Sequence, residues 1–597
     1  MRRLYCLDIL KAIAIIVVVF FHMGYLSYGY LGVDLFLVIN GYLITKSLSR
    51  KILESRPCEK YEKSANIYIN FLLDKIYRLL PVLLCASLFC ILWGYYVMLP
   101  DDYENLTQSI IASSFFSNNI LQAITTKDYW DVVNDYKPLM HTWYVGVLMQ
   151  FYLVYPILFY VARRSSSNSK GMFVLLLSVI SFISLLVYLG TKDVSDRFYY
   201  LPSRFFEFGV GGLVAICYDS TTQKKIFSSY LSILLIAVIV CFFVVNSDFI
   251  PSNLRLIVVV ALSVGLLLLQ DNLELLFAKR GIITSVFSKV GCMSYSIFVW
   301  HQVFLAFYRY SFTTKFSGLS LSLYFLLTII VSSISYHFIE EVINSRVKSG
   351  NKKALSFVLF FSFFAINGAS YFIYKMGGVT RDVPELDIYA GKSHSGQHAE
   401  YCDRANRYNK DFTSEKKHWL VIGNSFARDF VNIILESNVK DSVEVSYSNV
   451  EYSLSDACDS RYKNADKVFI STLGITPEFV TSITLKCVTN GLIRNNILIV
   501  GEKNFGENNG QIYWRRNTHN YYDMTTVMID GFNERNIEFK RKYDERFIDL
   551  IYYVKADGNR VRVFTDNGKF ISSDCRHLTK AGAIFYAHQI PLAKYLK

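Results

Sequence analysis

Residues 7–22 read LDILKAIAIIVVVFFH and residues 30–45 read YLGVDLFLVINGYLIT, and these two apolar stretches decide the fold. A helix of about 20 apolar residues crosses the hydrocarbon core of a bilayer. Similar stretches recur, and 52% of the 597 residues are hydrophobic, so a purely soluble enzyme is excluded. We expect eleven transmembrane helices, at residues 10–29, 30–48, 79–98, 139–161, 172–190, 204–218, 229–246, 254–270, 290–308, 317–339 and 355–375.

Positive charge is concentrated between these apolar segments. Residues 1–380 hold 32 Lys and Arg against 21 Asp and Glu, whereas residues 381–597 hold 30 against 28. If the N-terminus is cytoplasmic, the loops assigned to the cytoplasm carry 22 Lys and Arg, and the loops assigned outside carry 6. Such an asymmetry orients membrane proteins, so we expect everything after about residue 376 on the outer side. It also accounts for the net charge of +13 without nucleic acid as a partner.

The sequence changes character beyond about residue 380. Short β-rich runs alternate with amphipathic stretches, and a helix-like run follows near the end. The β-rich runs lie at 418–422, 465–471, 496–501 and 560–565, and the helix-like run at 579–595. This alternation predicts a doubly wound α/β domain. We expect a membrane domain at 1–345, a further membrane helix and linker at 346–415, and the α/β domain at 416–597.

Four cysteines fall in the part expected outside: Cys402, Cys458, Cys487 and Cys575. An oxidising compartment permits disulfides there, but four cysteines allow three pairings and the sequence does not choose among them. No CxxC or His-Cys cluster has zinc spacing, so no metal is expected.

Ionisable residues inside apolar segments are candidates for function, because burying them in a membrane is costly. The first segment contains Lys11 and His22, which are roughly 16 Å apart along a helix. Lys75 and Arg78 lie at the cytoplasmic end of the third segment. Several residues share the outer half of the membrane with His22 in the assigned orientation: Asp34, His141, Arg204, Glu207 and His301. One buried histidine is readily explained by a neighbouring helix, but convergence at one depth favours a site.

The order of these stretches resembles the acyltransferase family 3 of integral membrane acyltransferases. The resemblance covers about the first 345 residues. It rests on the two stretches quoted above, KIYRLLP at 75–81, PLMHTW at 138–143 and SYSIFVWHQ at 294–302. Two departures are notable. Lysine replaces the commoner arginine at 11 and 75, which loses the bidentate guanidinium, and Leu148 or Met149 occupies a position that is usually acidic.

This resemblance implies roles for the intramembrane residues. Lys75 and Arg78, assisted by Lys11, are expected to bind the phosphates of acetyl-CoA, with membrane anchoring as the alternative. His22 is expected to be the base or the acyl-relay residue, oriented by Asp34 or Glu207. His141 and His301 are expected to support it.

The outer domain resembles SGNH hydrolases in the order of four short blocks. These blocks are Gly423-Asn424-Ser425, Gly474, Gly501 with Asn504, and Asp574 three residues before His577. The resemblance implies that Ser425 is a nucleophile, His577 its general base and Asp574 the carboxylate that orients it. The amides of Ser425 and Gly474, with the side chain of Asn504, would form an oxyanion hole. Asn424 replaces the Asp that is usual at this position. The alternative is that the outer domain only binds glycan.

Fusion of these two parts resembles bacterial inner-membrane enzymes that O-acetylate surface polysaccharides such as lipopolysaccharide O-antigen. The resemblance implies acetyl-CoA as the acyl donor, a lipid-linked polysaccharide as the acceptor, a cytoplasmic N-terminus and a periplasmic α/β domain. Two alternatives stay open: a glycan transporter or binding protein with an outer acetyl esterase, and a peptidoglycan O-acetyltransferase. The sugar, its hydroxyl position, the length of the acyl group and the oligomeric state are not set by the sequence.

Overall fold

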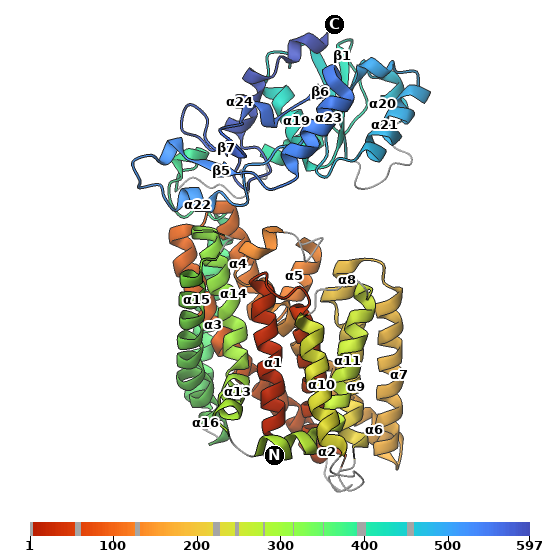
Figure 1. Ribbon diagram of the computed structural model, residues 1–597, viewed down its shortest axis with the longest axis vertical. Coiled ribbons are helices and arrows are strands. Elements are labelled where there is room, and N and C mark those ends of the chain that lie inside the picture. Colours follow the sequence, from red (N-terminus) through yellow and green to blue (C-terminus); the bar gives the residue numbers. More distant parts are fainter. Residues whose placement is uncertain are drawn as a thin grey trace. The chain divides into compact units, whose positions relative to one another are not determined.

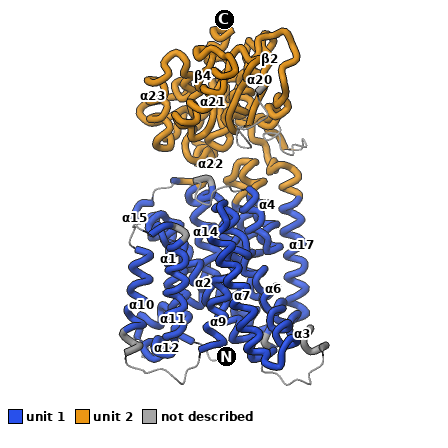
Figure 2. Tube along the Cα trace, turned by 90° about the vertical axis from the view of Figure 1, so that its right-hand side faces the viewer, with its two compact units in different colours: residues 1–93, 106–309, 313–371 blue, residues 94–105, 310–312, 372–597 orange. Residues whose placement is uncertain are grey.

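The computed structural model describes residues 4–53, 61–125, 132–218, 227–244, 250–278, 281–313, 316–349, 352–390, 401–449 and 459–596. The chain divides into two compact units, which Figure 2 colours separately. Unit 1 comprises residues 1–93, 106–309 and 313–371, and unit 2 comprises residues 94–105, 310–312 and 372–597.

Long helices run side by side in unit 1 (Figures 1 and 2). The α-helices of the first 375 residues are α1 (Tyr5–His22), α2 (Gly32–Ile52), α3 (Tyr61–Val97), α4 (Pro100–Ser114), α5 (Asn118–Thr125), α6 (Trp143–Ser165), α7 (Ser169–Gly190), α8 (Val194–Tyr199), α9 (Leu201–Cys217), α10 (Phe227–Val244), α11 (Ser252–Leu268), α12 (Gln270–Ala278), α13 (Ile282–Cys292), α14 (Ser294–Ser311), α15 (Gly318–Ser335), α16 (Val342–Lys348) and α17 (Lys353–Lys375).

The described residues hold seven helices that are long and apolar enough to cross a membrane, or nine if two bent pairs each count as one span. The pairs are α11 with α12, bent by 67°, and α13 with α14, bent by 71°. All eleven expected segments contain helix, but α9 and the apolar part of α10 are shorter than a full span. The chain is therefore a multi-pass membrane protein.

Close packing of α2 on α9 depends on glycine. A Cβ on Gly41 would lie 2.0 Å from the carbonyl oxygen of Phe208, and a Cβ on Gly211 would lie 2.1 Å from that of Val38. Small residues let membrane helices approach to backbone contact, where van der Waals packing holds them together. These glycines therefore fix the interface that carries Asp34 and Arg204, described below.

Unit 2 contains a five-stranded parallel sheet in the order β2-β1-β3-β4-β6. Its strands are β1 (Lys417–Gly423), β2 (Val443–Asn449), β3 (Lys467–Ile470), β4 (Ile497–Val500) and β6 (Phe547–Ile548). The helices of this unit are α19 (Ser425–Glu436), α20 (Asp459–Asn464), α21 (Pro477–Thr489), α22 (Gly510–Tyr513), α23 (Phe532–Tyr543) and α24 (Lys580–Gln589).

Helices cover both faces of this sheet. Alternate residues of a strand point to opposite faces, so each strand can contribute to two buried clusters. Trp419 and Val421 of β1 share one buried cluster with residues of α19 and α24. Leu420 and Ile422 share another with residues of α20, α21 and α23. The expected fold class, a helical membrane part followed by a doubly wound α/β domain, is confirmed.

One expected strand lies elsewhere. The run at 560–565 contributes β7 (Arg560–Arg562), which pairs antiparallel with β5 (Thr525–Val527) in a separate two-stranded sheet. The parallel sheet instead contains β2 and β6, which the expected runs did not include. The two residues of β6 are too few to give a sequence pattern.

The structure describes three cysteines of unit 2. Cys402, Cys487 and Cys575 are buried and form no disulfide with one another. Cys458 lies outside the described residues.

Candidate functional site

Three histidines from distant parts of the sequence meet inside unit 1. His22 ends α1, His141 lies in the 3₁₀ turn Met140–Thr142, and His301 lies in α14. The ring centroids of His22 and of His141 are each 5.3 Å from that of His301. Among the described residues, no group of His, Cys, Asp or Glu is arranged to hold a metal ion.

His301, at the centre of this histidine cluster, is held in one tautomer. Its Nδ1 lies 2.6 Å from the carbonyl oxygen of Phe298, and because a carbonyl only accepts, Nδ1 must donate. The proton of the neutral ring is therefore on Nδ1, and Nε2 keeps its lone pair. Nε2 is buried and has no hydrogen-bond partner within the described residues. The cluster thus contains a preset nitrogen base.

Lys11, Lys75 and Arg78, the three expected phosphate-binding residues, line one cavity of about 60 Å³. Lys11 forms an ion pair with Asp8 at 3.6 Å, and the Lys75 ammonium lies 4.9 Å from the centroid of the Tyr152 ring. We call this space the cation cavity. Leu148 also lines the cation cavity. If Leu148 is the equivalent of the residue that is usually acidic in the family, that position is apolar in this protein.

Phe298 lies between the cation cavity and the histidine cluster, and Tyr144 packs against it. Phe298 and Tyr144 both line the cavity, and their ring centroids are 5.3 Å apart. The Phe298 ring also lies 4.9 Å from His141 and 5.9 Å from His301. The two sites are therefore separated by the thickness of about one aromatic layer.

Asp34 and Glu207, expected to orient His22, form ion pairs with Arg204 instead. Arg204 Nη1 lies 2.6 Å from Asp34 Oδ1 and 2.9 Å from Glu207 Oε1, and all three side chains are at most 2% exposed. A buried guanidinium attracts carboxylates far more strongly than a neutral imidazole does. This triad joins α2 to α9, and the described residues show no contact of either acid with His22.

In unit 2, Ser425 begins α19 at a tight turn after β1. Gly423 has φ +143°, and a Cβ there would lie 1.7 Å from the carbonyl oxygen of Ser471, so only glycine fits. Asn424 Oδ1 accepts hydrogen bonds from the amides of Phe426 and Leu473, both at 3.1 Å. Asn424 thus caps α19 and ties the end of β1 to the loop after β3. Strand order reverses between β1 and β3, which is where α/β sheets bind ligands.

Asp574 and His577 form a hydrogen-bonded dyad. His577 Nδ1 lies 2.5 Å from Asp574 Oδ2, and Asp574 Oδ1 accepts from the amides of Arg576 and His577 at 3.0 and 2.7 Å. Cys575 between them has φ +73°, a strained conformation that closes the turn. Burial lowers the pKa of His577, but the Asp574 carboxylate outweighs burial and raises this pKa above 6.5.

Two buried charged residues, Asp429 and Lys503, connect α19 to the segments that carry His577 and Asn504. The sequence analysis did not single them out. Asp429, one helical turn after Ser425, accepts from the amide of Leu578 at 3.0 Å and pairs with Lys503 at 2.9 Å. The Lys503 ammonium also lies 3.6 Å from the centroid of the Phe426 ring. The first turn of α19 therefore contacts both the segment after His577 and the residue before Asn504. Their positions in the sequence could have revealed them, because Lys503 directly precedes Asn504 and Asp429 lies four residues after Ser425.

The expected oxyanion donors differ in their availability. The amide of Gly474 donates to Glu502 Oε1 at 2.5 Å, and Glu502 pairs with Arg535 at 2.6 Å, so this amide is occupied. Asn504 Oδ1 accepts from the amides of Gly506 and Ile529, which leaves its Nδ2 as a buried donor. Nδ2 has no partner within the described residues. Of these two groups, the structure leaves only Asn504 as an available donor.

Comparison with known proteins assigns the first part of the chain. A family model described as "Acyltransferase domain" matches residues 4–337, more than half of the chain. The chain belongs to this acyltransferase family. The chain is similar to proteins named "O-acetyltransferase OatA" from Staphylococcus aureus strains NCTC 8325 / PS 47, COL and MRSA252. Each is 25% identical over 367 residues, which cover 58% of this chain and 58% of the relative.

The matched region contains both intramembrane sites of this acyltransferase. The histidine cluster and the cation cavity lie within residues 4–337, whereas Ser425 and the Asp574–His577 dyad lie beyond them. The chain spans less than two thirds of the length of these relatives. The family match therefore covers the two sites of unit 1. Any chemistry of unit 2 has to be argued from the geometry of that unit.

Proposed function

We propose that this protein is an O-acetyltransferase of a bacterial inner membrane, which moves an acetyl group from cytoplasmic acetyl-CoA to a sugar hydroxyl of a surface polysaccharide. The observation that carries the proposal is the arrangement of the intramembrane residues. A cavity with three cations adjoins a cluster of three histidines across Phe298 and Tyr144. Family membership and the likeness to proteins named O-acetyltransferase support the same reaction class.

Lys11, Lys75 and Arg78 would bind the phosphates of acetyl-CoA, because clustered cations bind phosphate through charge-assisted hydrogen bonds. Acetyl-CoA is the donor substrate in this proposal. The acetyl group would pass the Phe298–Tyr144 layer to His22. His22 attacks the thioester carbonyl, the carbon–sulfur bond breaks, and the CoA thiolate leaves and takes up a proton. His301 accepts the imidazole proton of His22 at its free Nε2 and passes it to the departing thiolate.

Ser425 would then receive the acetyl group on the outer side. The serine hydroxyl attacks the carbonyl carbon of the exported acetyl group, and His577 Nε2 takes the hydroxyl proton. That proton leaves with the departing carrier group, so the nitrogen is free again. A sugar hydroxyl next attacks the acyl-serine and gives its proton to the same nitrogen, which passes it to the departing serine oxygen. This step forms the acetyl ester and restores the serine. Asn504 Nδ2 and the amides at the start of α19 would stabilise the oxyanion.

Ser425→Ala tests this relay. We expect glycan acetylation to stop, because no acyl-serine forms, while membranes still transfer label from radioactive acetyl-CoA to the membrane part. The measurements are NMR of the surface glycan and labelling of the purified protein. Ser482→Ala, on the exposed surface of α21, is the matched control and should acetylate normally. Normal acetylation by Ser425→Ala would show that the histidine cluster finishes the reaction alone.

A further inference from the structure

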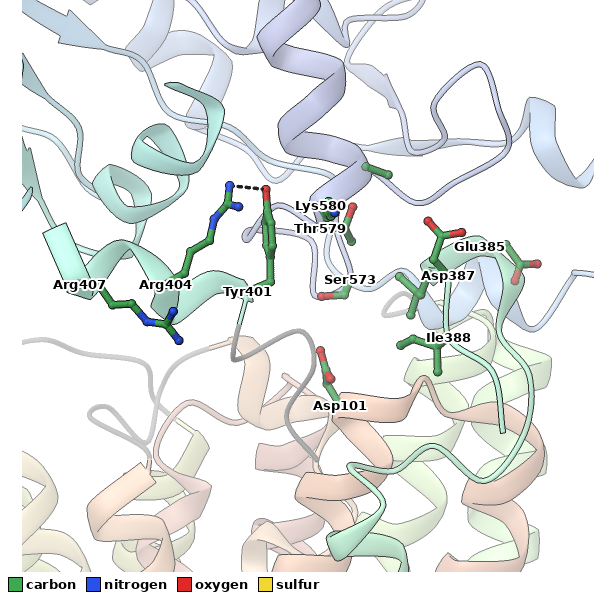
Figure 3. Close-up of a pocket in the computed structure, with 12 residues that line it drawn as sticks. Asp101, Glu385, Asp387, Ile388, Tyr401, Arg404, Arg407, Ser573, Thr579 and Lys580 are labelled. Atoms are coloured by element: carbon green, nitrogen blue, oxygen red, sulfur yellow. Dashed lines mark hydrogen bonds between the residues drawn. The ribbon is translucent and has the colours of Figure 1, made fainter. Parts of the chain in front are cut away.

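Unit 2 contains a cavity of about 390 Å³ that none of the steps above uses. Ser573 and Thr579, which flank the Asp574–His577 dyad in the sequence, both line this cavity (Figure 3). The chain segment that carries the proposed base therefore runs along the cavity wall. The volume falls at the lower end of the range for small-molecule pockets, about 300 to 1,000 Å³, which suits one or two sugar rings.

Tyr401 provides a fixed aromatic surface in this cavity. The Arg404 guanidinium lies 4.2 Å from the centroid of its ring and donates to its hydroxyl at 3.1 Å, as the dashed line in Figure 3 marks. The hydroxyl donates to Glu436 Oε1 at 3.1 Å, and Arg404 pairs with the same carboxylate at 2.6 Å. Such bonds hold the ring in place before a ligand arrives, which lowers the entropy cost of binding. Aromatic rings held this way present an apolar face beside polar groups.

The charges of the lining balance. Asp101, Glu385 and Asp387 contribute three carboxylates, and Arg404, Arg407 and Lys580 contribute three cations. Asp387 is further paired with Lys569 at 2.5 Å. A balanced set offers hydrogen-bond donors and acceptors to hydroxyl groups without favouring an anion or a cation. The lining therefore suits a neutral sugar better than a uronic acid.

We propose that this cavity is the acceptor subsite, which holds a neutral hexose residue of the glycan with one face on Tyr401 and one hydroxyl directed to His577. The proposal rests on the proposed function, since it supplies the acceptor for the acyl-serine. It adds the class of sugar and the residues that select it.

The test uses the full-length protein in detergent micelles. The probe is the neutral surface polysaccharide of the bacterium that carries this gene, released by mild acid, and binding is measured by saturation-transfer NMR and calorimetry. Tyr401→Ala should weaken binding tenfold or more, and Lys580→Ala should weaken it severalfold. Tyr401→Phe should lose less, because it keeps the ring. Tyr552→Ala is the matched control, since Tyr552 is 67% exposed and lies outside this cavity, and it should bind like the wild type.

Hydrolysis of p-nitrophenyl acetate separates this proposal from the proposed function. Tyr401→Ala should hydrolyse this small ester at the wild-type rate while losing glycan affinity. Ser425-dependent hydrolysis without glycan binding by the wild type would overturn the acceptor subsite alone. Glycan binding without Ser425-dependent hydrolysis would overturn the acyl-serine relay and leave the subsite standing. Tighter binding of oligogalacturonate than of the neutral polysaccharide would overturn the assignment to a neutral sugar.

Discussion

Replacing Asp574 by Asn isolates the charge of the dyad from its shape. The Asp574 carboxylate accepts three hydrogen bonds, from His577 Nδ1 and from the amides of Arg576 and His577. An Asn side chain is isosteric, and its carbonyl oxygen can still accept from both amides. The turn around Cys575 should therefore persist, and the loss should fall on the imidazole.

The size of the loss follows from the bond that changes. A hydrogen bond to a charged group contributes about 1.5 to 3 kcal/mol, and each 1.36 kcal/mol of barrier is tenfold in rate, which gives about 10- to 150-fold. If the Asn amide faces Nδ1, the ring proton moves to Nε2 and the base can no longer accept. The same change in a Ser-His-Asp protease costs about 10⁴-fold. We therefore expect Asp574→Asn to lose about 10²- to 10⁴-fold.

The assay is hydrolysis of p-nitrophenyl acetate by the full-length protein as a function of pH. His577 acts as a base only when neutral, so wild-type activity should fall as the pH drops through its raised pKa, above 6.5. Without the carboxylate, burial and the Lys503 ammonium lower the pKa of His577, and of the influences on it only Asp429 still raises it. The acid limb of the residual activity should therefore move to lower pH in Asp574→Asn.

Asp566→Asn is the matched control, because Asp566 is 79% exposed and pairs only with Arg562 among the contacts described. It should hydrolyse the ester at the wild-type rate. Retention of more than a tenth of wild-type activity by Asp574→Asn, with an unshifted acid limb, would refute a catalytic dyad and return this domain to glycan binding.

Three further substitutions test unit 1. His22→Ala should abolish glycan acetylation, measured by NMR, at a normal membrane level of the protein, and full acetylation would exclude His22 as the relay. Arg78→Ala should raise the KM for acetyl-CoA about 10- to 100-fold through loss of a charge-assisted bond, whereas an unchanged KM would restrict Arg78 to membrane anchoring. Arg204→Ala leaves Asp34 and Glu207 buried without a cation and should cost about 3 to 5 kcal/mol of stability, seen as a lower Tm in detergent, so an unchanged Tm would contradict the buried triad.

The sequence predicted features that repeat a local pattern. Apolar length placed the membrane helices, and strand periodicity placed β1, β3 and β4. The expected runs did not include β2 or β6, and the two residues of β6 carry no periodicity. The antiparallel pairing of β7 also could not be read, since strand direction depends on a partner distant in the sequence.

The site residues also divide into those that a local pattern predicts and those that depend on contacts distant in the sequence. Depth along the helices predicted that His22, His141 and His301 share a level, and the structure brings their rings together. Depth alone could not show that Arg204 would draw Asp34 away from His22, because that depends on helix rotation. The occupied amide of Gly474 likewise depends on Glu502, a residue outside every motif.

The bend between α13 and α14 has an electrostatic consequence for the cation cavity. Ser294 and Tyr295 line this cavity from the first turn of α14, and Phe298 lines it from the next turn. The N-terminus of a helix carries roughly half a positive charge. Unlike the charge of a lysine ammonium, this backbone charge is not lost by deprotonation and is not removed by a side-chain substitution. The cavity should consequently keep a measurable affinity for inorganic diphosphate in alkaline solution, and in a variant whose three cationic side chains have all been replaced by neutral ones.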